Sequence, residues 1–202
     1  MGKIFCVMGK SSSGKDSIYR EIMAREELPL KGIVGYTTRP IREGETPGRE
    51  YIFCDEAKVQ QLAAQKRIVE LRAYDTVCGV WKYFTVDDDQ IDLDNQNYLY
   101  IVTLEGFLSI QKYFGSDRVV PIYIEVEDGE RLLRAIARER QQKVPGFEEM
   151  CRRFLADSAD FSNEKLEKAG IERRFENIEL ETTIHQVTEY IRGEMNTGNE
   201  SQ

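Results

Sequence analysis

Residues 4–17 read Ile4-Phe5-Cys6-Val7-Met8-Gly9-Lys10-Ser11-Ser12-Ser13-Gly14-Lys15-Asp16-Ser17, and this stretch decides the fold. Its apolar beginning predicts a buried strand over residues 3–8, and helical spacing of apolar residues follows over residues 17–25. Between them, residues 9–15 match G-x-x-x-x-G-K in the strand, loop and helix context that this motif requires. The sequence therefore predicts a loop that holds the phosphates of a nucleotide.

The chemistry of this loop can be argued from its residue types. Glycines let backbone N–H groups curl around phosphate oxygens, and the start of the following helix adds partial positive charge. Lys15 would place a full charge on the β- and γ-phosphates. We therefore expect residues 9–17 to bind ATP. The alternative, a Ser/Gly turn that only caps a helix, would not require Lys15.

The position after the lysine departs from the usual motif, which has Ser or Thr there as a ligand of Mg²⁺. This chain has Asp16 at that position and Ser17 next to it. The Ser17 hydroxyl could take over the role, or Asp16 could hold Mg²⁺ through water. We favour Ser17 and keep Asp16 as the alternative.

Composition and charge restrict the other possibilities. The 202 residues fit one domain, or one core with small inserted lobes. A net charge of -8 and a pI of about 5.0 argue against a protein that binds DNA or RNA, because such proteins usually carry a basic face. Any phosphate must therefore meet a local positive pocket.

The cysteines and the N-terminus indicate a reducing compartment. The chain has one histidine and no C-x-x-C pair, so neither a zinc site nor a disulfide framework is favoured. We expect scattered reduced thiols at Cys6, Cys54, Cys78 and Cys151. The first apolar run is too short for a signal peptide or a membrane span, so we expect a cytoplasmic protein that meets no membrane.

The middle of the chain predicts a small, mixed, β-rich lobe over about residues 35–90. Pro and Gly are frequent over residues 28–53, so regular structure there must be short. The expected elements are a strand at 51–53, a helix at 55–66, and strands at 68–72 and 81–86 around an irregular segment at 75–79.

The rest of the chain predicts a return to an α/β core, with a parallel sheet flanked by helices, over about residues 1–34 and 96–195. Two apolar runs suit buried parallel strands. A Pro-Gly turn between two arginine-rich helices suggests a helical lid over about residues 138–153. The expected elements are strands at 98–102, 119–126 and 174–178, helices at 107–113, 130–142, 147–161 and 183–192, a turn at 143–146, and a frayed polar tail at 196–202.

A second motif follows the loop. Residues 37–53 read Thr-Thr-Arg-Pro-Ile-Arg-Glu-Gly-Glu-Thr-Pro-Gly-Arg-Glu-Tyr-Ile-Phe, and this segment resembles the guanylate kinase acceptor motif T-T-R-x-x-R-x-G-E-x-x-G-x-x-Y-x-F at every defined position. Two arginines and a tyrosine can converge on a dianionic phosphate through bidentate bonds. We expect Arg39, Arg42 and Tyr51 to hold the phosphate of the acceptor. A solvated charged surface would leave the spacing of the glycines unexplained.

The resemblance also implies residues for the acceptor base. Glu70 would bind the guanine edge, because its carboxylate suits the ring N1–H and the exocyclic amine together. Tyr83 would contact phosphate and Thr85 the base, although Phe84 replaces the family's glycine and Tyr83 and Phe84 could simply pack in a strand.

Two positions near the base depart from the family. Its typical members carry Ser and Asp where this chain has Gly35 and Thr103. Thr103 is retained as a candidate for binding GMP. The strictness of guanine selectivity therefore stays open.

The resemblance places mobile arginines in the predicted lid. Five arginines flank the turn at 143–146: Arg134, Arg138, Arg140, Arg152 and Arg153. We expect Arg138, Arg140 and Arg153 to stabilise the charge that spreads over a phosphoryl group in transfer. The alternative is that these helices carry charged faces, with glutamates as partners. Those glutamates are Glu139, Glu148 and Glu149.

Two further residues have separate interpretations. Asn177 lies in a segment that resembles the late strand where the family carries an asparagine near adenine, so it joins the ATP-binding candidates. His185 has no neighbouring carboxylate or cysteine pattern, and we expect a surface histidine.

Taken as a resemblance to the guanylate kinase family, the sequence implies Mg²⁺-dependent transfer of the γ-phosphate of ATP to GMP or dGMP. Lys15 and Arg42 join the lid arginines as catalytic candidates. No covalent intermediate with the protein is needed. We expect a monomer or homodimer with no nucleic acid polymer as partner.

Two rival functions are kept. Ribose 1,5-bisphosphate phosphokinases resemble the loop and also carry Asp after the lysine, but they lack the full acceptor motif. Scaffold proteins contain a non-catalytic guanylate-kinase-like module, which has usually degraded its phosphate loop, whereas Lys15 is present here.

Overall fold

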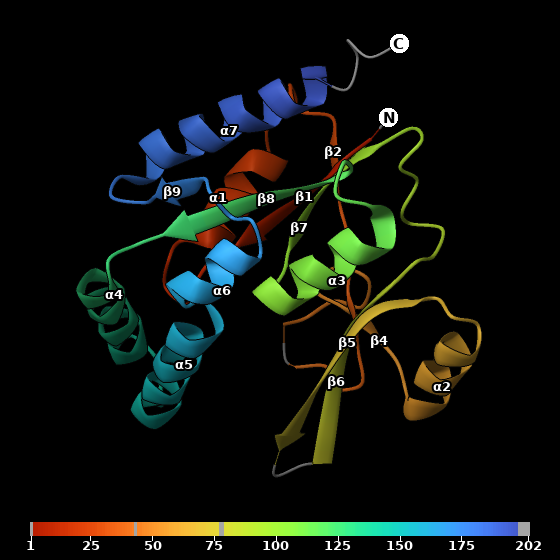
Figure 1. The fold of residues 1–202 in the computed structure, drawn as a ribbon. Coiled ribbons are helices and arrows are strands. Elements are labelled where there is room, and N and C mark those ends of the chain that lie inside the picture. Colours follow the sequence, from red (N-terminus) through yellow and green to blue (C-terminus); the bar gives the residue numbers. More distant parts are fainter. Residues whose placement is uncertain (1, 43, 77–78, 198–202) are drawn as a thin grey trace.

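Five parallel strands form the central sheet of the protein (Figure 1). The structure is a computed structural model that describes residues 2–42, 44–76 and 79–197. The strands lie in the order β2-β7-β1-β8-β9. Their bounds are β1 (Ile4–Met8), β2 (Leu30–Gly32), β7 (Asn97–Ile101), β8 (Val119–Glu125) and β9 (Arg174–Glu176). The predicted parallel α/β core is confirmed.

Helices cover both faces of this sheet, so the central strand β1 is buried on both sides. Alternate residues of β1 enter two different apolar clusters, as the two-residue period of a strand requires. On one face lie α1 (Lys15–Met23) and α7 (Leu180–Thr197). On the other face lie α3 (Leu104–Phe114) and α6 (Asn163–Lys168).

A second, mixed sheet forms the small lobe, with the order β4-β3-β6-β5. The helix α2 (Glu56–Ala64) packs Val59 and Leu62 against Phe84 and Val86 of this sheet. Asp55 begins α2 by accepting a hydrogen bond from the backbone N–H of Lys58 at 2.8 Å. The strands are β3 (Tyr36–Thr37), β4 (Ile52–Phe53), β5 (Ile68–Thr76) and β6 (Gly79–Val86).

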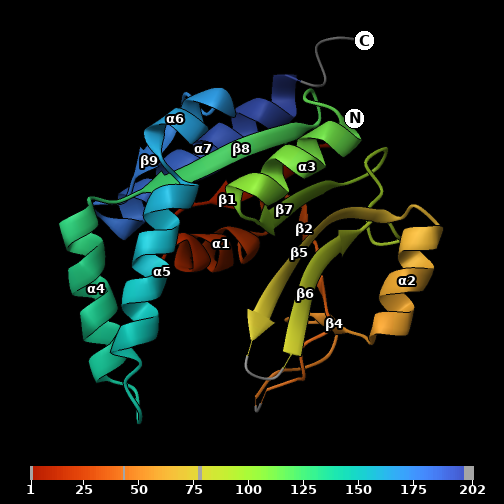
Figure 2. The same cartoon turned by 60° about the horizontal axis from the view of Figure 1, so that its bottom comes forward.

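Two helices form an arm beside the phosphate loop. These are α4 (Asp128–Arg140), which follows β8, and α5 (Phe147–Asp160), which runs back along it. In Figures 1 and 2 this arm and the small lobe extend from the same side of the central sheet. The predicted turn between two arginine-rich helices is therefore present at residues 141–146.

Three sequence expectations were wrong in detail. The segment 75–79 was expected to be irregular, but Asp75 and Thr76 pair with Val80 and Gly79 in the antiparallel ladder of β5 and β6, since cross-strand bonds override weak local preferences. The short helix α6 was not expected. The last helix begins at Leu180 and includes residues 196 and 197, because its apolar face packs on the sheet. Cys78, Glu43 and residues 198–202 lie outside the described residues.

No helix among the described residues combines the length and the apolar composition needed to span a bilayer. Cys6 is buried, Cys54 is half-buried and Cys151 is exposed, each as a free thiol.

We expect Ile184→Ala to lower the free energy of unfolding by about 3 kcal/mol, because this side chain of α7 is 1% exposed and its removal leaves a cavity. Chemical denaturation followed by circular dichroism measures the change. Leu133→Ala is the matched helical control, at 65% exposure, and should cost about 0.5 kcal/mol or less. Equal costs for the two variants would contradict this packing.

Candidate active site

The phosphate loop runs from the end of β1 to the start of α1 and passes close to neighbouring strands. A Cβ atom at Gly9 would lie 2.6 Å from the carbonyl oxygen of Ile124 and 2.8 Å from Ser13 Oγ, so only glycine fits. Gly14 caps α1 with a φ of 86°, and a Cβ there would collide with the Asn177 amide. The predicted motif therefore has the backbone geometry that the motif needs.

Two hydroxyl groups in this loop are buried without a partner. Ser12 Oγ and Ser13 Oγ are among the few buried side-chain atoms of the described residues that form no hydrogen bond. Buried polar groups are normally paired, so orphaned ones indicate a missing ligand. Phosphate oxygens would accept from both hydroxyls.

Lys15, Asp16 and Ser17 begin α1. The Nζ atom of Lys15 lies 3.4 Å from a carboxylate oxygen of Asp16, whose side chain is 74% exposed. Ser17 Oγ accepts a long hydrogen bond from Arg20 at 3.5 Å. Asp16 is therefore exposed at the helix start, whereas Ser17 is half-buried. Within residues 2–42, 44–76 and 79–197 no cluster of three acidic, histidine or cysteine side chains could hold a metal alone.

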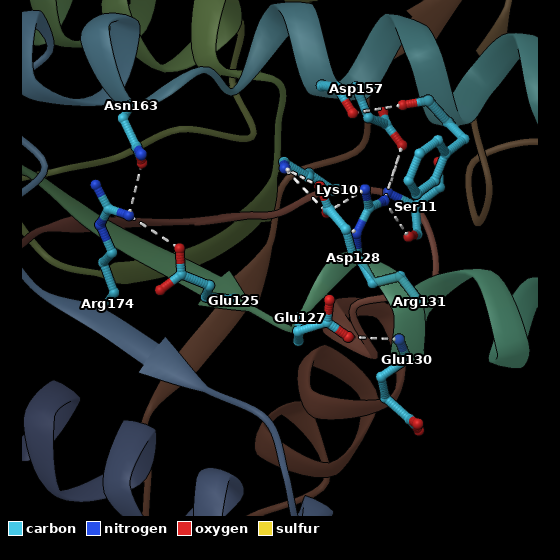
Figure 3. Close-up of polar contacts among 12 residues, drawn as sticks. Lys10, Ser11, Glu125, Glu127, Asp128, Glu130, Arg131, Asp157, Asn163 and Arg174 are labelled. Carbon is cyan, nitrogen blue, oxygen red and sulfur yellow. Dashed lines mark hydrogen bonds and ion pairs between the residues drawn. The ribbon is translucent and has the colours of Figure 1, made fainter.

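A network of charged side chains binds the phosphate loop at Lys10 and Ser11 (Figure 3). Arg131 is 1% exposed; it donates to Asp128 and, at 3.0 Å, to the carbonyl oxygen of Ser11. Lys10 Nζ lies 3.1 Å from Asp128. Burial acts to raise the pKa of Asp128, but bonds from Arg131 and Lys10 outweigh it, so this pKa lies below its usual range. Lys10 thus faces the network.

The same network reaches the second helix of the arm. The backbone N–H of Ser11 donates to Asp157 of α5 at 2.7 Å, and the Arg131 guanidinium stacks 4.6 Å from the Phe154 ring centroid. Sequence reasoning missed Asp128, Arg131 and Asp157. The sequence could have indicated only the pairing of Asp128 with Arg131, since residues three apart on a helix are neighbours.

Asn177, a predicted ATP-binding residue, lies beside the loop. Its Nδ2 donates to the carbonyl oxygen of Ser13 at 2.8 Å, and the residue is 3% exposed. Asn177, Arg134 and Ile178 line a cavity of about 450 Å³. The amide thus holds the loop at the edge of a cavity.

The proposed clamp for the acceptor phosphate is partly assembled. Arg39 is 4% exposed and binds the Glu45 carboxylate with both terminal nitrogens, one at 2.8 Å. Its guanidinium lies 5.2 Å from the Tyr51 ring centroid, and Tyr51 packs edge-on against Tyr83. The side chain of Arg42 is exposed, while its backbone N–H donates to Glu45. Sequence reasoning had given Glu45 no role beyond the motif.

The predicted base residues also meet. Thr85 Oγ1 donates to Glu70 at 2.9 Å, and Arg72 joins Glu70 to Thr103. Burial raises the pKa of Tyr100, whose hydroxyl is bonded to Thr85. Sequence reasoning missed Arg72 and Tyr100, because neither belongs to the motifs.

The three arginines of the predicted lid lie in different surroundings. Arg138 and Arg153 line a narrow cleft with Ser11 and Ser12, whereas Arg140 is exposed and does not line it. The charged-face alternative is also visible, because Glu149 binds Arg152 at 2.7 Å and Arg153 at 3.2 Å and Glu139 lies 4.0 Å from Arg138. His185 is exposed, as expected.

Comparison with known proteins gives one consistent result. The family model described as guanylate kinase matches residues 1–194. The guanylate kinase of Mycoplasma pneumoniae is 32% identical over 133 residues, which cover 65% of this chain and 54% of that protein. The guanylate kinase of Porphyromonas gingivalis is 27% identical over 194 residues, covering 95% of this chain and 97% of that protein.

A solved structure has the same fold. The crystal structure of guanylate kinase from Anaplasma phagocytophilum superposes with a TM-score of 0.63 at 19% identity, covering 96% of this chain and 86% of that one.

We expect the Glu45 carboxyl to titrate near pH 2, because its bonds to Arg39 lower its pKa from 4.5 to about 2. A lowered carboxyl pKa stabilises the fold above pH 4.5, and this contribution is lost as the pH falls from 4.5 towards 2. NMR of the side-chain carboxyl carbons measures the midpoint. In Arg39→Ala the midpoint should rise towards 4.5, while that of Glu149, whose pKa is lowered by its hydrogen bonds from Arg152, stays constant. An unmoved Glu45 midpoint would contradict the pairing.

Proposed function

Because this chain belongs to the guanylate kinase family, whose members are ATP-dependent nucleoside monophosphate kinases, we propose that it transfers the γ-phosphate of ATP to GMP. The observation that carries the proposal is the phosphate loop, in which the Ser12 and Ser13 hydroxyls are buried without a protein partner. The products are ADP and GDP.

ATP binds to residues 9–17. The loop backbone and the N-terminus of α1 surround the phosphates, and Lys15 neutralises the terminal ones. Asn177 holds the loop through Ser13, and the adjoining cavity accommodates the adenosine end.

Ser17 would hold Mg²⁺ through its hydroxyl, and Asp16, acting through water, is the alternative. Magnesium in such sites uses one or two protein oxygens together with water and substrate phosphates, so either side chain at the start of α1 suits it. Mg²⁺ bound there would supply positive charge that offsets the charge of the phosphates.

The acceptor binds to the lobe of residues 35–90. Arg39, Arg42 and Tyr51, with Tyr83 beside them, hold its phosphate. Glu45 aligns the first arginine, whose bidentate pairing fixes the plane of the guanidinium. The candidates for the base are Glu70, Thr85 and Thr103.

Positioning and charge neutralisation perform the chemistry. The acceptor oxygen attacks the γ-phosphate in line, with no covalent intermediate on the protein. The lobe and the lid of residues 138–153 close over the core of residues 1–34 and 96–195, which brings the lid arginines to the transferring group and excludes water. Arg138 and Arg153 already flank the loop, and Arg140 reaches the phosphates only after a movement of the lid. The cytoplasmic location, the monomeric or homodimeric state and dGMP as a second acceptor remain predictions.

One observation favours a second candidate. Asp16 after the lysine is shared with ribose 1,5-bisphosphate phosphokinases, and its carboxylate is exposed beside Lys15. The acceptor motif over residues 37–53 favours the nucleotide instead. The complete phosphate loop argues against the other rival function, a non-catalytic binding module.

We expect ADP to form from ATP with GMP and dGMP faster than with AMP, UMP or ribose 1,5-bisphosphate. A steady-state coupled assay with each acceptor at equal concentration measures the rates. Turnover only with ribose 1,5-bisphosphate would establish the second candidate, and no turnover with any acceptor would establish the binding module.

We expect Lys15→Ala to lower kcat with GMP by about 100-fold or more, since the charge that faces the developing phosphate charge is lost. The circular dichroism spectrum and Tm should be nearly unchanged, because the Lys15 side chain pairs with the exposed Asp16, and an exposed ion pair contributes little to stability. Lys58→Ala, an exposed lysine of α2, is the control and should retain full activity. Full activity in Lys15→Ala would refute the assignment of the loop.

A further inference from the structure

One arginine lies beside the residues that are expected to bind the acceptor base. Arg72 lies on β5 two residues after Glu70, so both side chains project from the same face of the strand. Its Nε donates to Glu70 Oε2 at 3.0 Å and a terminal nitrogen donates to Oε1 at 3.3 Å. The other terminal nitrogen reaches Thr103 Oγ1 at 3.4 Å. Arg72 therefore binds both residues that the resemblance assigns to the guanine edge.

The ion pair is well shielded. The Glu70 side chain is 3% exposed and the Arg72 side chain 21%. Burial lowers the pKa of Arg72, but the charge and hydrogen bonds of Glu70 outweigh it, so the net shift is upward and Arg72 stays charged. Glu70 thus has a permanent cation beside it.

The hydroxyl groups around Glu70 have a fixed direction. The Thr85 hydroxyl donates its single hydrogen to Glu70, because an ionised carboxylate can only accept. The Tyr100 hydroxyl, 2.9 Å from Thr85 Oγ1, must then donate to Thr85. A Cβ atom at Gly35 would lie 3.0 Å from the Tyr100 hydroxyl. Tyr100 therefore fills the space next to the position where the family carries a serine.

The acceptor capacity of Glu70 is nearly used. Its two oxygens already receive two bonds from Arg72 and one from Thr85. A carboxylate accepts about four hydrogen bonds, so about one position remains. Guanine presents two donors on this edge, the ring N1–H and the 2-amino group, and Glu70 can accept only one of them while Arg72 is in place.

Arg72 has hydrogen-bond donors that Glu70 and Thr103 do not use. Its guanidinium has further N–H groups, and with Thr103 it lines a cavity of about 410 Å³ whose other walls include Tyr74, Leu104 and Leu108. These N–H groups suit a carbonyl oxygen next to the ring N–H. The 6-oxo group of guanine, hypoxanthine and xanthine is such an oxygen.

We infer that Arg72 is a specificity-determining residue, which makes this site read the 6-oxo and N1–H edge of a purine and ignore the 2-amino group. The acceptor class is then the 6-oxopurine nucleoside monophosphates, with inosine monophosphate (IMP) accepted beside GMP. This inference rests on the proposed function, because it assumes that the acceptor base lies against Glu70. The family's typical members carry Asp at the position of Thr103, so two carboxylates lie near the base there. This chain has only the carboxylate of Glu70 at those two positions.

The experiment compares GMP with IMP. For the wild-type protein we expect values of kcat/KM within about tenfold of each other, and similar Kd values from titration calorimetry. In Arg72→Ala the freed carboxylate accepts both donors of guanine, so the preference for GMP over IMP should rise about 10- to 100-fold. Arg72→Gln tests the same change with less loss of volume, and the double variant R72A/T103D should show the largest preference.

Arg67→Ala is the matched control. Arg67 adjoins the other end of β5, where its Nε donates to the carbonyl oxygen of Asp87. Its removal loosens the lobe without touching Glu70, so the ratio of GMP to IMP should stay within twofold of wild type. If Arg72 had a purely structural role, its variants would also leave the ratio of GMP to IMP unchanged and would lower kcat/KM equally for both substrates.

The inference is overturned if wild type rejects IMP by more than about 100-fold, or if neither Arg72 variant changes the ratio. The calorimetry separates this failure from that of the proposed function. Equal binding of GMP and IMP without turnover supports the inference and contradicts the proposed kinase activity. Turnover of GMP with rejection of IMP supports the kinase activity and contradicts the inference. Binding of neither nucleotide contradicts both.

Discussion

The close approach of the phosphate loop to β8 is the constraint on which the rest of the structure depends. At Gly9 the loop backbone passes so near the Ile124 carbonyl that a side chain has no room. This contact turns the chain sharply after β1 into the loop that leads to α1. The Asn177 amide then fixes Ser13 from the side of β9. Residues at the ends of three parallel strands therefore hold the loop in position.

The arm of α4 and α5 takes its position from the same loop. Arg131 is buried between the two helices and the loop, and its charge is balanced by Asp128 and, at 3.7 Å, by Asp157. A buried arginine without these carboxylates would be costly, so the network ties the arm to the loop. The arginines of the proposed lid lie on the same helices with exposed side chains, and two of them, Arg138 and Arg153, line a cleft beside the loop.

The small lobe shows a different use of charge. Arg39 and Glu45 form a pair inside the proposed phosphate clamp, and Arg72 and Glu70 form another near the expected base. In each pair one charge orients the other before a ligand arrives, which reduces the reorganisation that binding requires. The aromatic rings of Tyr51, Tyr83 and Tyr74 connect the two pairs along the lobe.

The sequence by itself determined the phosphate loop, the acceptor motif and the order of the main elements, because each depends on residues that are close in the chain. Strand, glycine turn and helix follow one another within residues 4–17, and local geometry imposes them. Continuous apolar runs likewise indicated a buried parallel sheet flanked by helices. The family comparison agrees with the motifs.

Only the tertiary structure decided which charges meet. Ser11 and Asp157 are 146 residues apart, Ser11 and Arg131 are 120 apart, and Arg72 and Thr103 are 31 apart. No local pattern specifies such pairs, since they depend on how the elements pack and on which side chains lose water together. The loop can therefore be recognised from its residues, whereas the surroundings that set its partners and the selectivity of the base site are products of the fold.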